Sequence, residues 1–203
     1  MKKLLLPALV FCVYAVSAQN STNESGKLRL GFDLGMNYSL LHSNEPLADG
    51  SEIYNGMGAR FGVVMDYSIT QKLLFSPKAE FAFNKCGVEF SGTEAATSDY
   101  KVFKTSVDLM AHMIFKPGTG KSALYLLAGP ALRSPLKFRS ESPSTYTTKP
   151  DLAIDFGIGL QNQLKFFQLA PELRYSFGLL NISKHPSVES LNYQNISLVM
   201  SFK

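Results

Sequence analysis

The side chains of this chain that could do chemistry are few and widely separated. The histidines and cysteines are His42, His112, His185, Cys12 and Cys86. Ligands of a structural zinc ion come in close pairs along the chain, and no such pair occurs among these residues. The sequence therefore predicts no metal site.

One short segment resembles the end of a phosphate-binding loop. It runs from Pro117 to Ser122 and reads PGTGKS. The full motif needs a glycine five positions before Gly120, where this chain has Phe115, and it joins a strand to a helix. Here the flanking residues have the pattern of two strands. The sequence predicts no nucleotide and no other cofactor.

Nucleophilic catalysis has one candidate arrangement, in which His112 would work with Ser106 or Ser76. These three residues are expected on the same side of a β-sheet, so a small barrel with a lipid-modifying active site is one alternative. The chain contains no G-x-S-x-G nucleophile motif. The prediction is therefore a protein that is not an enzyme and has no catalytic residues.

The elements that would position these residues are strands with two unlike faces. Between Leu28 and Leu40, alternate residues are all apolar, and the residues between them are polar, charged or glycine. A period of two indicates a β-strand. The run is longer than most strands of soluble domains and fits the roughly 9–11 residues that a tilted strand needs to cross a bilayer.

Seven further segments repeat this alternation. They are expected at residues 57–67, 73–83, 103–115, 124–133, 152–164, 167–179 and 194–202. The connections between them alternate between long and short, as in outer-membrane barrels with short periplasmic turns and longer outer loops. The prediction is an all-β, eight-stranded antiparallel up-and-down transmembrane β-barrel with both chain ends in the periplasm.

The first residues have the pattern of an export signal. Lys2 and Lys3 precede an apolar run that ends in Val16-Ser17-Ala18, a small-residue cleavage pattern. We expect a signal peptide at residues 1–18, a flexible leader at 19–26 and the barrel at 27–203. Removing the signal leaves 18 basic and 16 acidic side chains, so the charge gives no reason to expect a nucleic-acid partner.

The composition of the two faces indicates which side meets lipid. The apolar faces carry no charged residue, and aromatic residues gather towards strand ends, as in membrane girdles. A soluble barrel with its charges in water would also alternate. The polar faces, however, hold many glycines, which weaken a water-exposed strand but suit a narrow lumen. These glycines are Gly31, Gly35, Gly58, Gly62, Gly129, Gly157, Gly159 and Gly178. We therefore expect the outer membrane as location and its lipid as partner.

The charged residues on the predicted inner face balance, with six of each sign. Buried charges must be paired, so the sequence predicts a lumen ion-pair network that plugs the barrel and leaves no conducting pore. Arg29 and Asp66 are the best candidates for a single pair, because neighbouring strands bring both to the same end. The network is expected to contain Arg29, Asp33, Arg60, Asp66, Lys78, Glu80, Lys104, Asp108, Arg133, Asp155, Glu172 and Arg174.

The last third of the chain resembles a known family. The segments DFGIGL (residues 155–160), FQLAPELRYS (167–176) and GLLNI (178–182) are similar to the PorT-like outer-membrane β-barrel family of Bacteroidota. The resemblance implies a structural or accessory role in type IX protein secretion or gliding, with secretion-system proteins as partners. The alternative is an OmpX-like surface barrel that binds outside partners through loops 42–56, 84–100 and 134–151.

Overall fold

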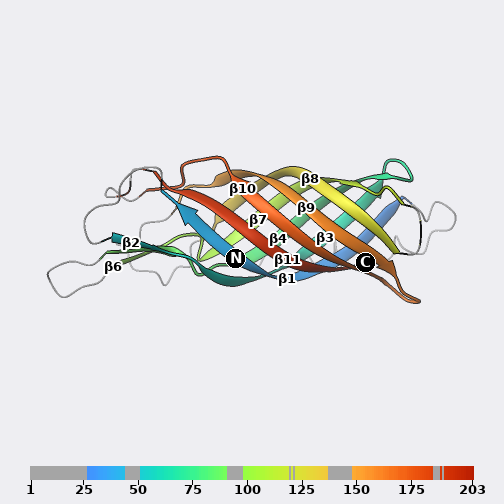
Figure 1. Ribbon diagram of the computed structural model, residues 1–203, viewed down its shortest axis with the longest axis horizontal. Helices are drawn as coiled ribbons and strands as arrows, with labels where there is room; N and C mark the ends of the chain where they lie inside the picture. The colour runs from blue at the N-terminus through green and yellow to red at the C-terminus, as the bar shows by residue number, and fades with distance from the viewer. Residues whose placement is uncertain are drawn as a thin grey trace, which may run out of the picture.

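The structure is a computed structural model that describes residues 27–43, 51–90, 98–118, 120, 122–136, 148–184, 188 and 190–203. Eight antiparallel strands close into a barrel in the order β1-β11-β10-β9-β8-β7-β4-β3 (Figure 1). The strands are β1 (Leu28–His42), β3 (Gly56–Ser68), β4 (Leu73–Phe83), β7 (Thr105–Phe115), β8 (Ser122–Pro135), β9 (Asp151–Gln163), β10 (Gln168–Gly178) and β11 (Asn192–Phe202). The predicted all-β, eight-stranded barrel is confirmed. The expected signal peptide and leader, residues 1–26, lie outside the described residues.

Closure depends on β1, which pairs with β3 on one side and with β11 on the other. Leu34 lies opposite Phe61 of β3 and opposite Met200 of β11. All three side chains belong to the apolar set that the alternation predicted. A slip of one residue in either pairing would turn the apolar set inward, so the pattern fixes the register.

Three short strands form a second sheet in the order β2-β5-β6, beyond one end of the barrel (Figure 1). They are β2 (Ser51–Tyr54), β5 (Gly87–Phe90) and β6 (Ser98–Lys101). These segments were expected to be loops, and that expectation was wrong. Each short strand lies along the chain next to a barrel strand, β3, β4 or β7, so the second sheet continues part of the barrel wall.

The start of β7 also differs from the expectation. Phe103 is the first residue of the expected strand 103–115 and would belong to its apolar, lipid-facing set. In the structure it adopts a left-handed backbone with φ of 45°, and its side chain is buried. This turn between β6 and β7 interrupts the alternation, because a strand keeps its period only while its backbone stays extended. Lys104, expected in the lumen, is exposed instead.

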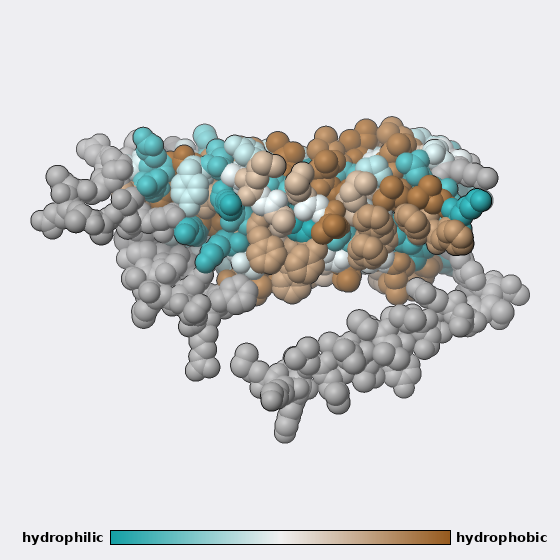
Figure 2. All heavy atoms as spheres, turned by 90° about the horizontal axis from the view of Figure 1, so that it is seen from below, coloured by the Kyte–Doolittle hydropathy of each residue, from teal (hydrophilic) through white to brown (hydrophobic). Residues whose placement is uncertain are grey.

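The outer wall of the barrel is apolar. Leucine, phenylalanine, valine, isoleucine and methionine side chains stay exposed all around it; Leu34 is 57% exposed and Val63 is 62% exposed. Figure 2 shows this wall as a broad brown surface, with hydrophilic residues towards both ends of the barrel. An apolar surface of this extent requires a hydrocarbon solvent.

The two ends of the barrel have different connections. The turns β3–β4, β7–β8 and β9–β10 are short and lie at the end that also holds Lys27 and Lys203. We call this end the terminal mouth. Lys27 accepts a backbone hydrogen bond from Ser68, and Lys203 exchanges two with Gln168. Short turns are typical of the periplasmic side of outer-membrane barrels, so we expect the terminal mouth to face the periplasm and the second sheet to face outward.

Among the described residues, no helix is both long and apolar enough to cross a membrane.

The apolar wall leads to a prediction about Leu34, which lies near the middle of β1. Leu34→Arg should destabilise the folded protein by about 2–4 kcal/mol, because a guanidinium near the bilayer centre loses its hydration. Urea unfolding in lipid vesicles measures this change. Leu180→Arg is the matched control. Leu180 is exposed beyond the end of β10, and the cost there should fall to about 0–1 kcal/mol. Equal costs at the two positions would contradict the placement of the bilayer.

Candidate functional site: the charged lumen

The lumen is lined by the polar halves of all eight barrel strands, and its side chains fill it. The glycines on the inner face leave room for larger neighbours. A methyl group on Gly62 would lie 2.8 Å from the Glu80 side chain, and one on Gly159 would overlap the ring of Tyr125. Small residues are therefore required at these points, because the interior of an eight-stranded barrel has just enough space for its side chains.

The main feature of the lumen is a continuous chain of ion pairs in which the sign of the charge alternates. Lys78 Nζ lies 3.3 Å from Asp33 and 3.0 Å from Glu172, and Glu172 lies 3.5 Å from Arg174. The chain continues through Arg174–Glu80 at 2.9 Å, Glu80–Arg60 at 3.3 Å, Arg60–Asp108 at 2.9 Å, Asp108–Arg133 at 3.3 Å and Arg133–Asp151 at 3.3 Å. Every member of this chain is buried.

The central pairs reach from wall to wall. Lys78 and Glu80 lie on β4, whereas Glu172 and Arg174 lie on β10, on the opposite side of the closed strand order. Arg174 donates from Nη2 to both Glu80 oxygens at 2.9 Å, and Lys78 donates to both Glu172 oxygens at 3.0 and 3.1 Å. Tyr125 adds a further hydrogen bond to Glu172. These contacts span the middle of the lumen from one wall to the other.

Two further pairs lie beside this chain. His112 Nε2 is 2.9 Å from Asp155 Oδ2 inside the barrel. At the terminal mouth, Lys203 Nζ is 2.6 Å from Asp66 Oδ2, and Ser76 donates to the other Asp66 oxygen at 2.7 Å. The buried carboxylates of Asp155 and Asp66 therefore each lie within hydrogen-bonding distance of a nitrogen or hydroxyl group, as buried charges require.

The structure brings most of the twelve expected residues together, but not all of them. Arg29 lies opposite Asp66 in the β1–β3 register. Its side chain is exposed, however, and donates to Gln168, while Asp66 pairs with Lys203. The expected Arg29–Asp66 ion pair is therefore replaced by an Asp66–Lys203 pair. Lys104 lies outside the lumen for the reason given above.

The sequence did not predict two charged residues that form ion pairs in the lumen, Asp151 and Lys203. Asp151 was assigned to the preceding loop, but it is the first residue of β9 and shares a face with Ala153 and Asp155. Lys203 follows Val199 and Ser201 on the inner face of β11. Extending the alternation by one step at each of these strand ends would have found both residues.

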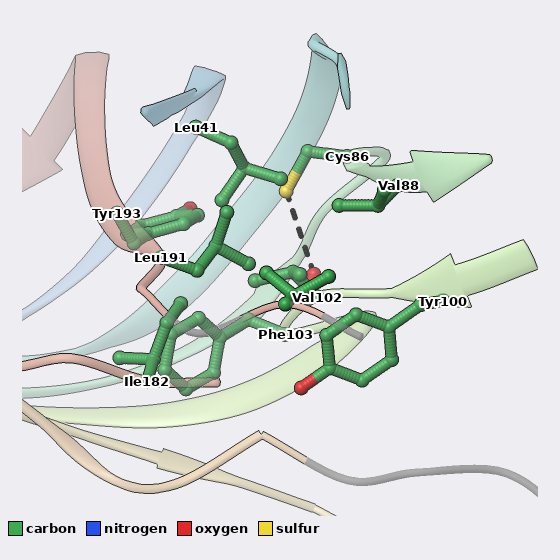
Figure 3. Close-up of a cluster of buried hydrophobic side chains, with 10 residues drawn as sticks. Leu41, Cys86, Val88, Tyr100, Val102, Phe103, Ile182, Leu191 and Tyr193 are labelled. Atoms are coloured by element: carbon green, nitrogen blue, oxygen red, sulfur yellow. Dashed lines mark hydrogen bonds between the residues drawn. The ribbon is translucent and has the colours of Figure 1, made fainter. Parts of the chain in front are cut away.

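The outward end of the lumen is closed by an apolar cap. The guanidinium of Arg133 lies over the ring of Tyr193, 4.3 Å from its centroid, and Phe103 meets the same ring edge-on. Above them, side chains from the second sheet and the outer connections pack into one buried cluster (Figure 3). This cluster consists of Leu41, Cys86, Val88, Tyr100, Val102, Phe103, Ile182, Val188, Leu191 and Tyr193.

The free cysteine belongs to this cap. Cys86 is buried and its Sγ donates to the Val102 carbonyl at 3.4 Å (Figure 3). Burial raises the pKa of the Cys86 thiol to about 12, so the reactive thiolate is scarce at neutral pH. Cys86 therefore serves packing in this structure.

The arrangement proposed for nucleophilic catalysis is not assembled. Ser106 donates to Asp108 at 2.8 Å, and Ser76 donates to Asp66 at 2.7 Å, so both hydroxyls are directed at carboxylates. The Nδ1 atom of His112 has no hydrogen-bond partner in the part of the chain that the structure describes. No group of His, Cys, Asp and Glu within that part could hold a metal ion.

Comparisons with known proteins give one family and one fold. Residues 17–184 match the family model described as an outer membrane protein beta-barrel domain. Neisserial surface protein A superposes with a TM-score of 0.53 at 14% identity, covering 87% of this chain and 98% of that chain. Outer membrane protein OprG from Pseudomonas aeruginosa superposes with a TM-score of 0.52 at 10% identity, covering 86% and 91%. No curated protein matches the sequence.

The ion-pair chain leads to a prediction about Arg174. Arg174→Met should cost about 3–5 kcal/mol of stability, because it leaves Glu80 and Glu172 buried beside one fewer cation. The measurement is unfolding in urea, in which the fraction of folded barrel is monitored by its gel mobility. Lys104→Met removes the same charge at an exposed position and should cost less than about 1 kcal/mol. If Arg174→Met lowers the free energy of unfolding only slightly, the ion-pair chain contributes little to the stability of the barrel.

Proposed function

The chain belongs to the outer membrane protein β-barrel domain family. We propose that it acts by binding other proteins and that it neither conducts solutes nor catalyses a reaction. Its location is the outer membrane, where the apolar wall meets lipid. A barrel in this position acts through its lumen, through its wall or through its two ends. The ends are the parts that remain available when the lumen is filled.

The observation that carries this proposal is the filled lumen. The ion-pair chain runs from Asp33 to Asp151 and crosses the barrel between β4 and β10. The apolar cap closes the outward end. On the other side of the pairs, a second buried cluster is formed by Leu74, Ile114, Tyr125, Leu127 and Ala170. A solute passing through would have to separate several buried ion pairs, each of which is costly to break.

Within this proposal, the partners are components of type IX secretion. The support is the resemblance of residues 155–182 to the PorT-like family. Two residues of the most similar stretch, Glu172 and Arg174, lie at the centre of the ion-pair chain. The resemblance therefore includes residues of the ion pairs in the lumen as well as residues of the wall.

A second candidate is a surface barrel that binds a partner outside the cell, and the second sheet favours it. This sheet extends the barrel outward and has two edge strands, β2 and β6. Beside it lies a hollow of about 470 Å³, lined by Tyr54, Asn84, Lys85, Cys86, Glu89, Lys101 and Lys104. Edge strands and a lined hollow are features that a protein partner can use.

The filled lumen predicts the electrical behaviour of the protein. The purified protein in planar lipid bilayers should give no stable open channel, because the ion pairs and the cap block the axis. Single-channel recording at physiological salt checks this expectation. Large, regular conductance steps would contradict the closed state of the barrel and the proposal that depends on it.

The secretion role predicts the effect of deleting the gene. Proteins that carry type IX export signals should accumulate inside the deletion strain and reappear in the medium when the wild-type gene is restored. Immunoblotting of medium and cell fractions measures this. Unchanged secretion would refute the type IX role, and loss of binding to an external partner in the same strain would favour the second candidate.

A further inference from the structure

The terminal mouth carries an excess of positive charge that the lumen network does not use. We propose that this mouth binds an acidic segment of a periplasmic protein, with Arg29 and Lys116 holding its carboxylates. The inference rests on the proposed function, the binding of other proteins at the ends of the barrel, and names the class of partner at one end. It concerns the opposite end of the barrel from the second sheet, and it does not depend on a role in type IX secretion.

The site is a hollow of about 590 Å³ at the open end of the lumen. Arg29 comes from β1 and Lys116 directly follows β7, and the β3–β4 turn forms part of the rim. Leu74, Ala123 and Gln161 belong to the inner lining, and Lys27 lies at the edge. The volume falls within the range of known binding sites for small ligands and peptide segments.

The two principal cations have neutral partners. Lys116 is only 9% exposed, and its ammonium donates to the side-chain oxygen of Gln161. Arg29 donates to the side-chain oxygen of Gln168. A buried lysine is costly unless an anion lies nearby, and an amide oxygen compensates the charge only in part.

The acidic side chain at this end of the barrel is already engaged. Asp66 receives the Lys203 ammonium at 2.6 Å and the Ser76 hydroxyl at 2.7 Å. Among the described residues, Asp66 is the only acidic side chain at this end of the barrel. The exposed side chains of Lys72 and Lys165 lie on the short turns of the same end. The mouth therefore has a net positive charge that an acidic ligand would neutralise.

The titration of Lys116 agrees with this geometry. Burial, together with the neighbouring cations Lys203 and Arg29, lowers the pKa of Lys116 to about 8, although Asp66 acts in the opposite direction. A bound carboxylate would favour the charged form of Lys116. Binding of an acidic ligand should therefore weaken as the pH rises through this value.

The position and lining favour a peptide over a lipid headgroup or a phosphate ion. The hollow is lined by Leu74, Ala123 and Gln161, which belong to the inward-facing residues of their strands, so it is separated from the lipid-facing wall. Ser68, Thr70 and Gln71 on the rim offer hydrogen-bonding groups for a peptide backbone, and Leu74 and Ala123 offer an apolar floor. A phosphate ion would satisfy the cations but would leave most of the hollow unfilled.

The test uses the full-length protein in detergent micelles and a rhodamine-labelled hexaglutamate peptide, with binding measured by fluorescence anisotropy. We expect saturable binding that weakens with added salt, and no binding of the matching hexaglutamine peptide. Arg29→Gln and Lys116→Gln should each weaken binding about tenfold, the effect of losing one charge-assisted contact. Lys165→Gln removes one charge from the same end outside the hollow and should change binding less than twofold, that is, by about 0.4 kcal/mol at most.

Gel mobility with and without heating confirms that each variant is folded. For the wild type, affinity should fall between pH 7 and 9.5, and Lys116→Gln should remove most of that fall. The proposal is overturned if the peptide does not bind, or if Lys165→Gln weakens binding as much as Lys116→Gln. Displacement of the peptide by inorganic phosphate at equal concentration would assign the site to a small anion and refute the peptide.

Discussion

The charged side chains inside this barrel have little access to water, and this constraint shapes much of the rest of the structure. A buried carboxylate or guanidinium is tolerated when an opposite charge and hydrogen-bond donors replace its lost hydration. The chain meets this requirement by alternating acids and bases from Asp33 to Asp151, so that each interior member of the series has a neighbour of opposite sign on both sides. Glycines on the inner face make room for these long side chains.

The same constraint separates the parts of the molecule. Charges that face the lumen pair with one another across the barrel, and the apolar wall faces lipid. The protein binding that we propose therefore involves the two ends of the barrel, which differ in chemistry. The outward end presents a small sheet above an apolar cap, and the terminal mouth presents Arg29 and Lys116 around an open hollow.

Most of the barrel could be predicted because a strand between two solvents has a strict period. The alternation around Leu34 and Phe61 predicted both the strand and the side that each residue faces. It failed where the backbone departs from the extended form: the left-handed turn at Phe103 reverses the expectation for Lys104. It also failed for the second sheet, whose strands span four residues each and are too short for a clear period. Alternation shows which side a residue faces but not how far its side chain extends, so it could not predict that Asp66 pairs with Lys203.

The ion pairs between β4 and β10 join residues that are 94 positions apart in the chain. In the strand order, β7, β8 and β9 separate β4 from β10, so these residues can meet only when the sheet curls into a cylinder. An open sheet would leave their charges unpaired, and unpaired charges are costly to bury in hydrocarbon. The ion pairs therefore favour the closed barrel over an open sheet within the bilayer.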